Sequence, residues 1–159
     1  MAYRISGLAA EPFAPLFSMD EADLAGHGAR RVIASASRGF PCRVSLEDAR
    51  EGEALILLHH VSHDVPTPYR SAYAIYVREA AVQAGPFIDC TPPVFEGRPL
   101  GLRGFCPEGN LIDARLALPG DADAGIVGLF ANPQIAYIDA HNAAHGCFAA
   151  RVERHGDRQ

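Results

Sequence analysis

Apolar and polar residues are arranged along the chain in the short-period patterns typical of β-strands. Residues 53–61 hold the longest unbroken apolar run, which indicates a central strand covered on both faces. Residues 72–78 alternate, which places Ile75 and Val77 together on one face of a second strand. The same criteria predict strands at residues 2–6, 29–35, 100–105, 110–118, 134–140 and 146–153.

Helical patterns are fewer and shorter. Ser18 and Glu21 form an S-x-x-E capping box, which predicts a short helix that ends at Gly26. Residues 122–131 carry one apolar stripe and predict a second helix. A helical turn is expected across residues 46–50.

Runs of neighbouring strands with few helices favour an α+β fold over alternating β-α-β units. We therefore predict a mostly antiparallel sheet of about seven to nine strands, with two or three short helices packed on it. Residues 1–159 are expected to form one domain, with a frayed tail at 154–159. The proline-rich segment 84–99 is predicted to be a long loop, a kind of segment that is often functional.

The amino-acid composition excludes several classes of protein for this chain. With 48% hydrophobic and 21% charged residues, the chain has the profile of a folded globular protein. Its net charge of −5 argues against nucleic-acid binding, which depends on neutralising phosphates. All 14 basic residues are arginine, so lysine Schiff-base chemistry and the P-loop lysine are excluded. No motif for a nucleotide or other cofactor is present, and we expect no cofactor.

The cysteines and the N-terminal residues indicate the cellular compartment in which we expect the protein. The four cysteines include no C-x-x-C pair, which excludes a zinc ribbon or a thioredoxin motif. The first residues lack the apolar stretch of a signal peptide, and no apolar run is long enough to span a membrane. We expect a cytoplasmic protein with free thiols and no membrane partner.

Two cysteines are candidate nucleophiles. Cys42 precedes Arg43, although a strand would point these two side chains to opposite faces. Cys147 lies near His141 and Asn142, and the three suit a Cys–His–Asn arrangement. The alternative is that both thiols are structural, because free cysteine is among the most buried residue types.

Arginines and tyrosines beside the predicted strand ends suggest a pocket for a small anion. The candidate ligand-binding residues are Arg43, Tyr69, Arg70, Arg103 and Asn142. Arginine holds a carboxylate or a phosphate through two parallel hydrogen bonds. The alternative is that these arginines form surface ion pairs of little energetic value.

Histidine spacing leaves a zinc site open as a third hypothesis. His59 and His63 are four residues apart, as are His141 and His145, and Cys147 follows the second pair. Residues four apart share a face on a helix or a straight strand. Zinc requires three or four such ligands, and chance spacing among seven histidines is the alternative, so no residue is assigned as a metal ligand.

Several sequence blocks together resemble one bacterial family. They are P-C-R-V-S-L at 41–46, D-A-R-E-G-E at 48–53, P-Y-R at 68–70, A-I-Y-V at 74–77 and G-C-F-A-A-R-V-E-R at 146–154. In these blocks and their order, the chain resembles the family catalogued as domain of unknown function 1203. The resemblance implies no activity, and no catalytic residue follows from it.

The favoured expectation is therefore a module that binds a small anionic ligand or a protein partner, with a homodimer as one option for its assembly. A small enzyme with a cysteine nucleophile and a zinc-binding protein are the alternatives.

Overall fold

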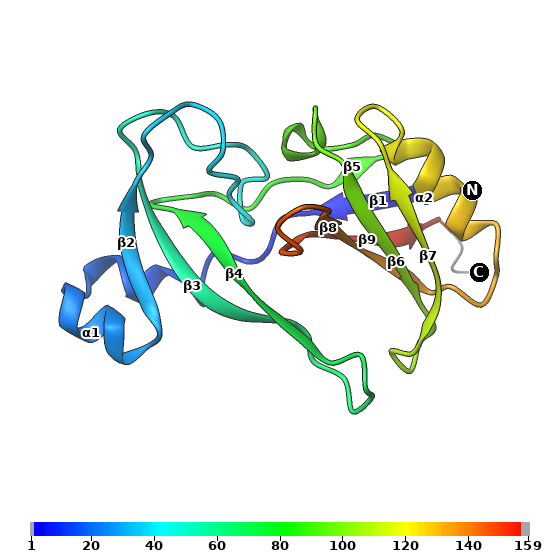
Figure 1. The fold of residues 1–159 in the computed structure, drawn as a ribbon, viewed down its shortest axis with the longest axis horizontal. Helices are drawn as coiled ribbons and strands as arrows, with labels where there is room; N and C mark the ends of the chain where they lie inside the picture. The colour runs from blue at the N-terminus through cyan, green and yellow to red at the C-terminus, as the bar shows by residue number, and fades with distance from the viewer. Residues whose placement is uncertain (1, 157–159) are drawn as a thin grey trace.

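The computed structural model describes residues 2–156 and has an α+β fold built on two antiparallel sheets. The larger sheet has the strand order β5-β1-β9-β8-β6-β7, and the smaller sheet has the order β2-β3-β4. Figure 1 shows the two sheets on opposite sides of the molecule, with the β8–β9 hairpin between them. The predicted fold class is confirmed, although the strands divide between two sheets.

The described part of the chain contains nine strands and two α-helices. The strands are β1 (Ala2–Ser6), β2 (Ala29–Ile33), β3 (Ala54–His63), β4 (Ser71–Arg78), β5 (Phe87–Ile88), β6 (Leu100–Phe105), β7 (Leu111–Ala117), β8 (Tyr137–Asn142) and β9 (Phe148–His155). The helices are α1 (Glu21–Gly26) and α2 (Ala122–Phe130), with 3-10 turns at Ala14–Ser18 and Pro93–Phe95. No helix in this part of the chain has the length and apolarity to cross a membrane.

The long apolar run forms β3, the centre of the smaller sheet, as its sequence predicted. The predicted helical turn at residues 46–50 is wrong. This segment instead closes back on itself through a bridge between Pro41 and Asp48, and Leu46 adopts a positive φ of 52°. The capping box is also wrong in detail, because Asp20, and not Ser18, caps α1 by accepting a hydrogen bond from the backbone of Asp23 at 2.8 Å.

The tail predicted at 154–159 falls partly within the last strand. Arg154 and His155 continue β9 and pair with the start of β1. Residues 157–159 lie outside the described residues.

The main core lies between the larger sheet and α2. Ile126, Leu129 and Phe130 of the helix are buried against this sheet. Gly125 permits the close approach, because a Cβ at this position would lie 2.7 Å from Leu102 Cδ1. A second core, formed by Phe13, Cys42, Val44, Ile75 and Val77, packs against the smaller sheet.

Polar side chains connect the two sheets across the middle of the molecule. Arg103 of β6 donates from Nη1 to the hydroxyl of Tyr73 on β4 at 3.0 Å. The buried His63 of β3 shares a 2.8 Å hydrogen bond with the hydroxyl of Tyr137 on β8. Arg151 of β9 donates to the carbonyl of Ser62 at 3.3 Å. The relative position of the sheets is therefore set by directional contacts as well as by apolar packing.

The ion pair between Asp139 and Arg151 stabilises this junction. Asp139 is fully buried and accepts two hydrogen bonds from Arg151, at 2.7 and 2.9 Å. We predict that Asp139→Ala lowers the free energy of unfolding in urea by about 3 kcal/mol, because it leaves a half-buried guanidinium without its partner. Asp64→Ala, which breaks the exposed pair with Arg70, is the control and should cost under about 0.5 kcal/mol. Equal losses in the two variants would contradict this assignment.

Candidate active site

A pocket of about 530 Å³ opens where the two sheets meet. Its walls come from the loop before β3, from β3 and β4, from the segment before β6 and from the β8–β9 hairpin. Pro41, Leu57, Ala74 and Pro99 make much of the wall apolar. The volume is in the range typical of sites for small molecules.

Arg43 lies at the base of this pocket and is only 3% exposed. Its backbone is fixed on both sides, because its N–H donates to Tyr76 of β4 and its carbonyl accepts from Leu8. Its side chain donates from Nε to the carbonyl of Phe148 at 2.7 Å and from Nη1 to the carbonyl of Pro41. The guanidinium is thus held rigidly between the smaller sheet and the last strand of the larger one.

The third contact of Arg43 is the sulfur of Cys147. Nη2 of Arg43 donates to Cys147 Sγ at 3.2 Å, and Nδ2 of Asn142 donates to the same sulfur at 3.4 Å. Two N–H donors are therefore directed at this one sulfur atom. Cys147 is partly exposed and lines the pocket, so a ligand can reach it.

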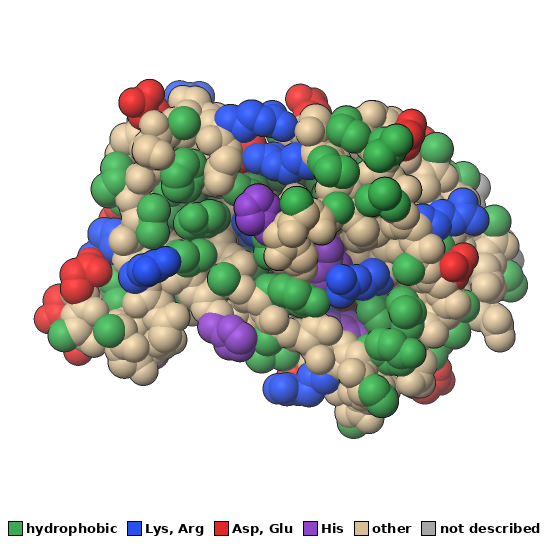
Figure 2. Space-filling model, in the orientation of Figure 1, with side chains coloured by type: hydrophobic (Ala, Val, Ile, Leu, Met, Phe, Trp, Pro, Cys, Tyr) green, Lys and Arg blue, Asp and Glu red, His purple; other side chains and the backbone are tan. Residues whose placement is uncertain are grey.

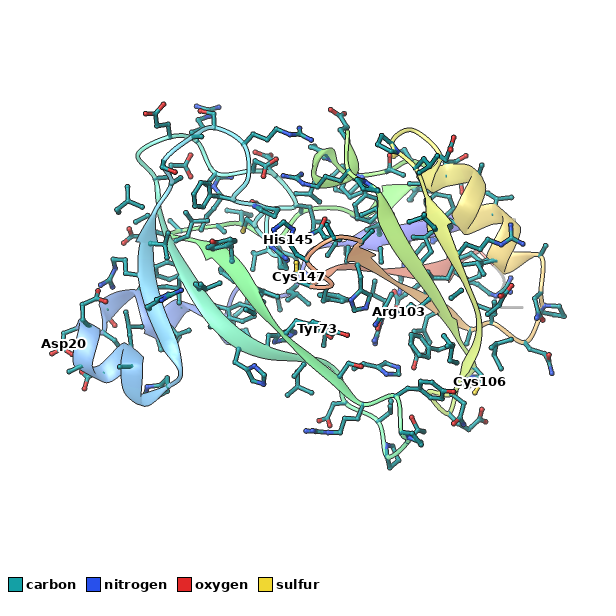
Figure 3. The ribbon with its side chains drawn as sticks, viewed as in Figure 1. Asp20, Tyr73, Arg103, Cys106, His145 and Cys147 are labelled. Atoms are coloured by element: carbon teal, nitrogen blue, oxygen red, sulfur yellow. The ribbon has the colours of Figure 1, made fainter. Side chains whose placement is uncertain are left out.

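The β8–β9 hairpin determines where this sulfur lies. The N–H of Asn142 donates to the carbonyl of Cys147 at 2.9 Å, and the N–H of Gly146 donates to the carbonyl of Asn142 at 2.7 Å. Gly146 has a φ of 76°, a conformation that glycine adopts without strain. Figure 3 shows His145 and Cys147 side by side on this hairpin, in the middle of the molecule.

The charge of Arg43 has no carboxylate partner within residues 2–156. Seven ion pairs join arginines to carboxylates in this part of the chain, and Arg43 belongs to none of them. Burial lowers the pKa of Arg43, and the nearby sulfur of Cys147 opposes that shift. A guanidinium remains protonated in proteins, and the side-chain contacts of this one are the carbonyls of Phe148 and Pro41 and the sulfur of Cys147.

Other polar groups complete the walls of the pocket. Arg98 donates to both oxygens of Asp48, at 2.7 and 3.0 Å, so its charge is already balanced. Oδ1 of Asn142 is buried and has no hydrogen-bond partner among the described residues. His145 is exposed at the rim. Figure 2 shows acidic side chains mainly around the periphery of this face of the molecule, whereas basic and apolar groups lie nearer its middle.

The structure separates the two candidate cysteines. Cys42 is fully buried in the core of the smaller sheet, where its sulfur accepts from the backbone of Ser45 and Arg78. Its contacts differ from those of Arg43, but residues 41–43 form isolated bridges and the start of a turn, not the short strand that the sequence suggested. Cys147 alone of the two lines the pocket.

His141 is buried behind the hairpin and does not line the pocket. Its Nδ1 contacts the carbonyl of Gly146 at 3.0 Å, and its ring packs against Tyr73. Because a carbonyl only accepts, Nδ1 carries the proton of this contact. His141 therefore supports the turn that presents Cys147.

Three of the predicted ligand-binding residues lie outside the pocket lining. Tyr69 and Arg70 lie at the end of the β3–β4 hairpin, where both are exposed and Arg70 pairs with Asp64 at 3.0 Å. Arg103 contacts Tyr73, which lines the pocket, but Arg103 itself does not. Arg43 and Asn142 are the two members of the predicted set in the lining.

The histidine pairs do not converge. A bulge in β3 between Val61 and His63 places His63 on the face opposite to His59, so their spacing does not bring them together. Both ring nitrogens of His63 are engaged, by Tyr69 and Tyr137. Between residues 2 and 156, no group of three or more His, Cys, Asp or Glu side chains is arranged to hold a metal ion.

Comparison with known proteins adds a family. The family model described as a protein of unknown function, DUF1203, matches residues 39–154. The chain belongs to this family. Arg43, Asn142 and Cys147 all lie within the region that DUF1203 covers, whereas β1, α1 and β2 lie before it. No curated protein and no solved structure matches the chain.

Sequence reasoning missed Arg98 and Pro99 as parts of the site. These two residues are the last of the proline-rich segment 84–99. The length of that segment was the one feature of the sequence that could have pointed to them. This segment is not wholly irregular, because it contains β5 and a 3-10 turn.

Two histidines, His141 and His60, should make the free energy of unfolding depend on pH. Burial lowers the pKa of His141 and of His60 below the ordinary value of 6.5, so the folded protein binds fewer protons than the unfolded chain near and below that pH. The free energy of unfolding should therefore fall as pH falls below 6.5, by up to about 1.4 kcal/mol per pH unit for each histidine.

The variant His141→Asn tests this, because asparagine retains a donor for the Gly146 carbonyl but does not titrate. Urea unfolding of this variant, from neutral to mildly acidic pH, should show a weaker pH dependence than the unaltered protein. Identical slopes in the two proteins would contradict the prediction.

Proposed function

We propose that this protein acts through Cys147, whose thiolate adds to a carbonyl carbon of a small molecule bound in the pocket. A C–S bond forms while the C=O π bond opens, and the carbonyl oxygen takes up a proton. The observation that carries the proposal is the pair of donors, Arg43 and Asn142, directed at Sγ. A thiolate is the nucleophilic form of cysteine, and adjacent positive charge stabilises it. A merely structural thiol needs neither a buried cation nor an opening to solvent.

The surroundings of Cys147 indicate the kind of ligand. The apolar walls suit a molecule with a compact apolar body. His145, at the rim beside Cys147, can give or take a proton when the bond to sulfur forms or breaks.

Alkylation of the native protein tests the proposal, because each cysteine is scored separately by peptide mass spectrometry. At neutral pH, iodoacetamide should modify Cys147 about tenfold faster than Cys90, although Cys90 is more exposed. Arg43→Met should remove most of this advantage, and Asn142→Ala should reduce it. Arg43→Lys should restore part of it by returning the positive charge.

Two cysteines provide internal controls for these variants. The rate at Cys90 should not change, and Cys42 should stay unlabelled as long as the core is intact. Labelling of Cys42 would show that a variant has unfolded, and its Cys147 rate would then be set aside in favour of Asn142→Ala. If Cys147 in the unaltered protein reacts no faster than Cys90, the proposal fails.

A second candidate function is binding of a small anion without covalent chemistry. It rests on the buried guanidinium of Arg43, which no carboxylate balances within the described residues. An anion in the pocket and the thiolate would compete for this charge, since either one neutralises it. Alkylation of Cys147 can therefore report on both candidates.

We predict that millimolar benzoate slows alkylation of Cys147, whereas benzamide, a neutral molecule of the same shape, does not. The physical reason is that benzoate can neutralise Arg43 in place of the thiolate. The rate at Cys90 serves as the control for changes in ionic strength. Equal protection by both compounds would show that the pocket selects shape and not charge, and no protection by either would reject anion binding.

A further inference from the structure

We infer that β7, the edge strand of the larger sheet, pairs with β7 of a second copy of this chain. Such pairing would join two six-stranded sheets into one continuous sheet. This assembly does not depend on the pocket, and it replaces a general expectation of a homodimer with one named surface.

The first observation is that β7 is open. It pairs with β6 on one side and ends the strand order of the larger sheet, as Figure 1 also shows. Residues 112–116 are all exposed, including Ile112 at 36% and Leu116 at 66%. An exposed edge strand with apolar side chains is a template for pairing with another strand.

The second observation shows which residues of β7 have backbone N–H and C=O groups that point away from β6. The N–H of Ala114 donates to Oδ1 of its neighbour Asp113 at 2.8 Å, which indicates that this N–H points away from β6. Because the direction alternates along a strand, Leu116 points its backbone groups outward as well. A bulge at Ile112, which has no partner on β6, interrupts the alternation there. A partner strand would therefore meet outward backbone groups at Ala114 and Leu116.

The third observation is charge complementarity about one point. In an antiparallel pair centred on Ala114, Asp113 of each copy lies opposite Arg115 of the other. The two-fold symmetry of a homodimer makes each contact twice.

Neighbouring registers are disfavoured by the same charges. Centring the pair on residue 113 would place Asp113 opposite itself, and centring it on residue 115 would do the same for Arg115. Like charges directly opposite one another destabilise a strand pair. Among these three registers, only the one centred on Ala114 places opposite charges against one another.

The charged side chains are available for this role. Arg115 and Asp113 are exposed, and neither forms an ion pair within residues 2–156. Asp113 occupies only the N–H of Ala114, a bond that a carbonyl of the partner strand would replace. The junction is narrow for a protein interface, so we expect roughly micromolar affinity.

Sedimentation velocity over a range of concentrations tests the inference. The unaltered protein should pass from monomer to dimer as concentration rises. Asp113→Arg and Arg115→Asp should each weaken the dimer at least about tenfold, because each places two like-charged pairs in the junction. The double variant carrying both changes should recover dimerisation.

Mixing the two single variants provides a sharper control. In a mixed dimer, the chain with Asp113→Arg would present two arginines, and the chain with Arg115→Asp would present two aspartates opposite them. An equimolar mixture should therefore dimerise although neither variant does so alone. Rescue of this kind requires the two strands to pair in the register proposed.

A backbone variant separates pairing from charge. Ala114→Pro removes an N–H that β6 does not use, so the monomer should keep its fold by circular dichroism while the dimer is lost. A protein that stays monomeric at the highest concentration reached would overturn the inference. A dimer that survives Ala114→Pro and both charge reversals would overturn it equally, because another surface would then form the dimer.

Discussion

The buried guanidinium of Arg43 is the constraint on which the centre of the molecule depends. It reaches from the smaller sheet to the carbonyl of Phe148 at the start of β9 and to the sulfur of Cys147 beside it. A charge that is only 3% exposed cannot rely on water, so its neighbours must satisfy it by geometry. The pocket, the hairpin and the sulfur of Cys147 are arranged around this need.

The same constraint explains why the site lies between sheets and not within one. The loop before β3, which is hydrogen-bonded to β4 of the smaller sheet, brings the cation. The β8–β9 hairpin of the larger sheet brings the sulfur and the amide of Asn142. The contacts of Tyr73 with Arg103, and of His63 with Tyr137, hold the sheets in the position that allows this. Polar contacts between the sheets therefore serve the fold and the site together.

Local sequence patterns predicted most of the fold, because strands and helices reflect periodicity and capping over a few residues. The apolar run that forms β3 was readable in this way. The division into two sheets was not, since it depends on pairings between distant segments. The bulge in β3 could not be predicted from the sequence either. It alone places His63 on the face of the strand opposite to His59. Arg43 and Cys147 were both candidates, but residue types do not show that two side chains 104 positions apart touch.

The strand order makes the contacts of Cys147 depend on the docking of β9. β9, the last strand of the chain, lies between β1 and β8, so the larger sheet has a gap at its middle until the end of the chain is in place. Cys147 directly precedes that strand, and only when the strand has docked does this cysteine meet Arg43. In a chain whose β9 has not docked, Cys147 therefore lacks the contact with Arg43 that it has in the folded protein.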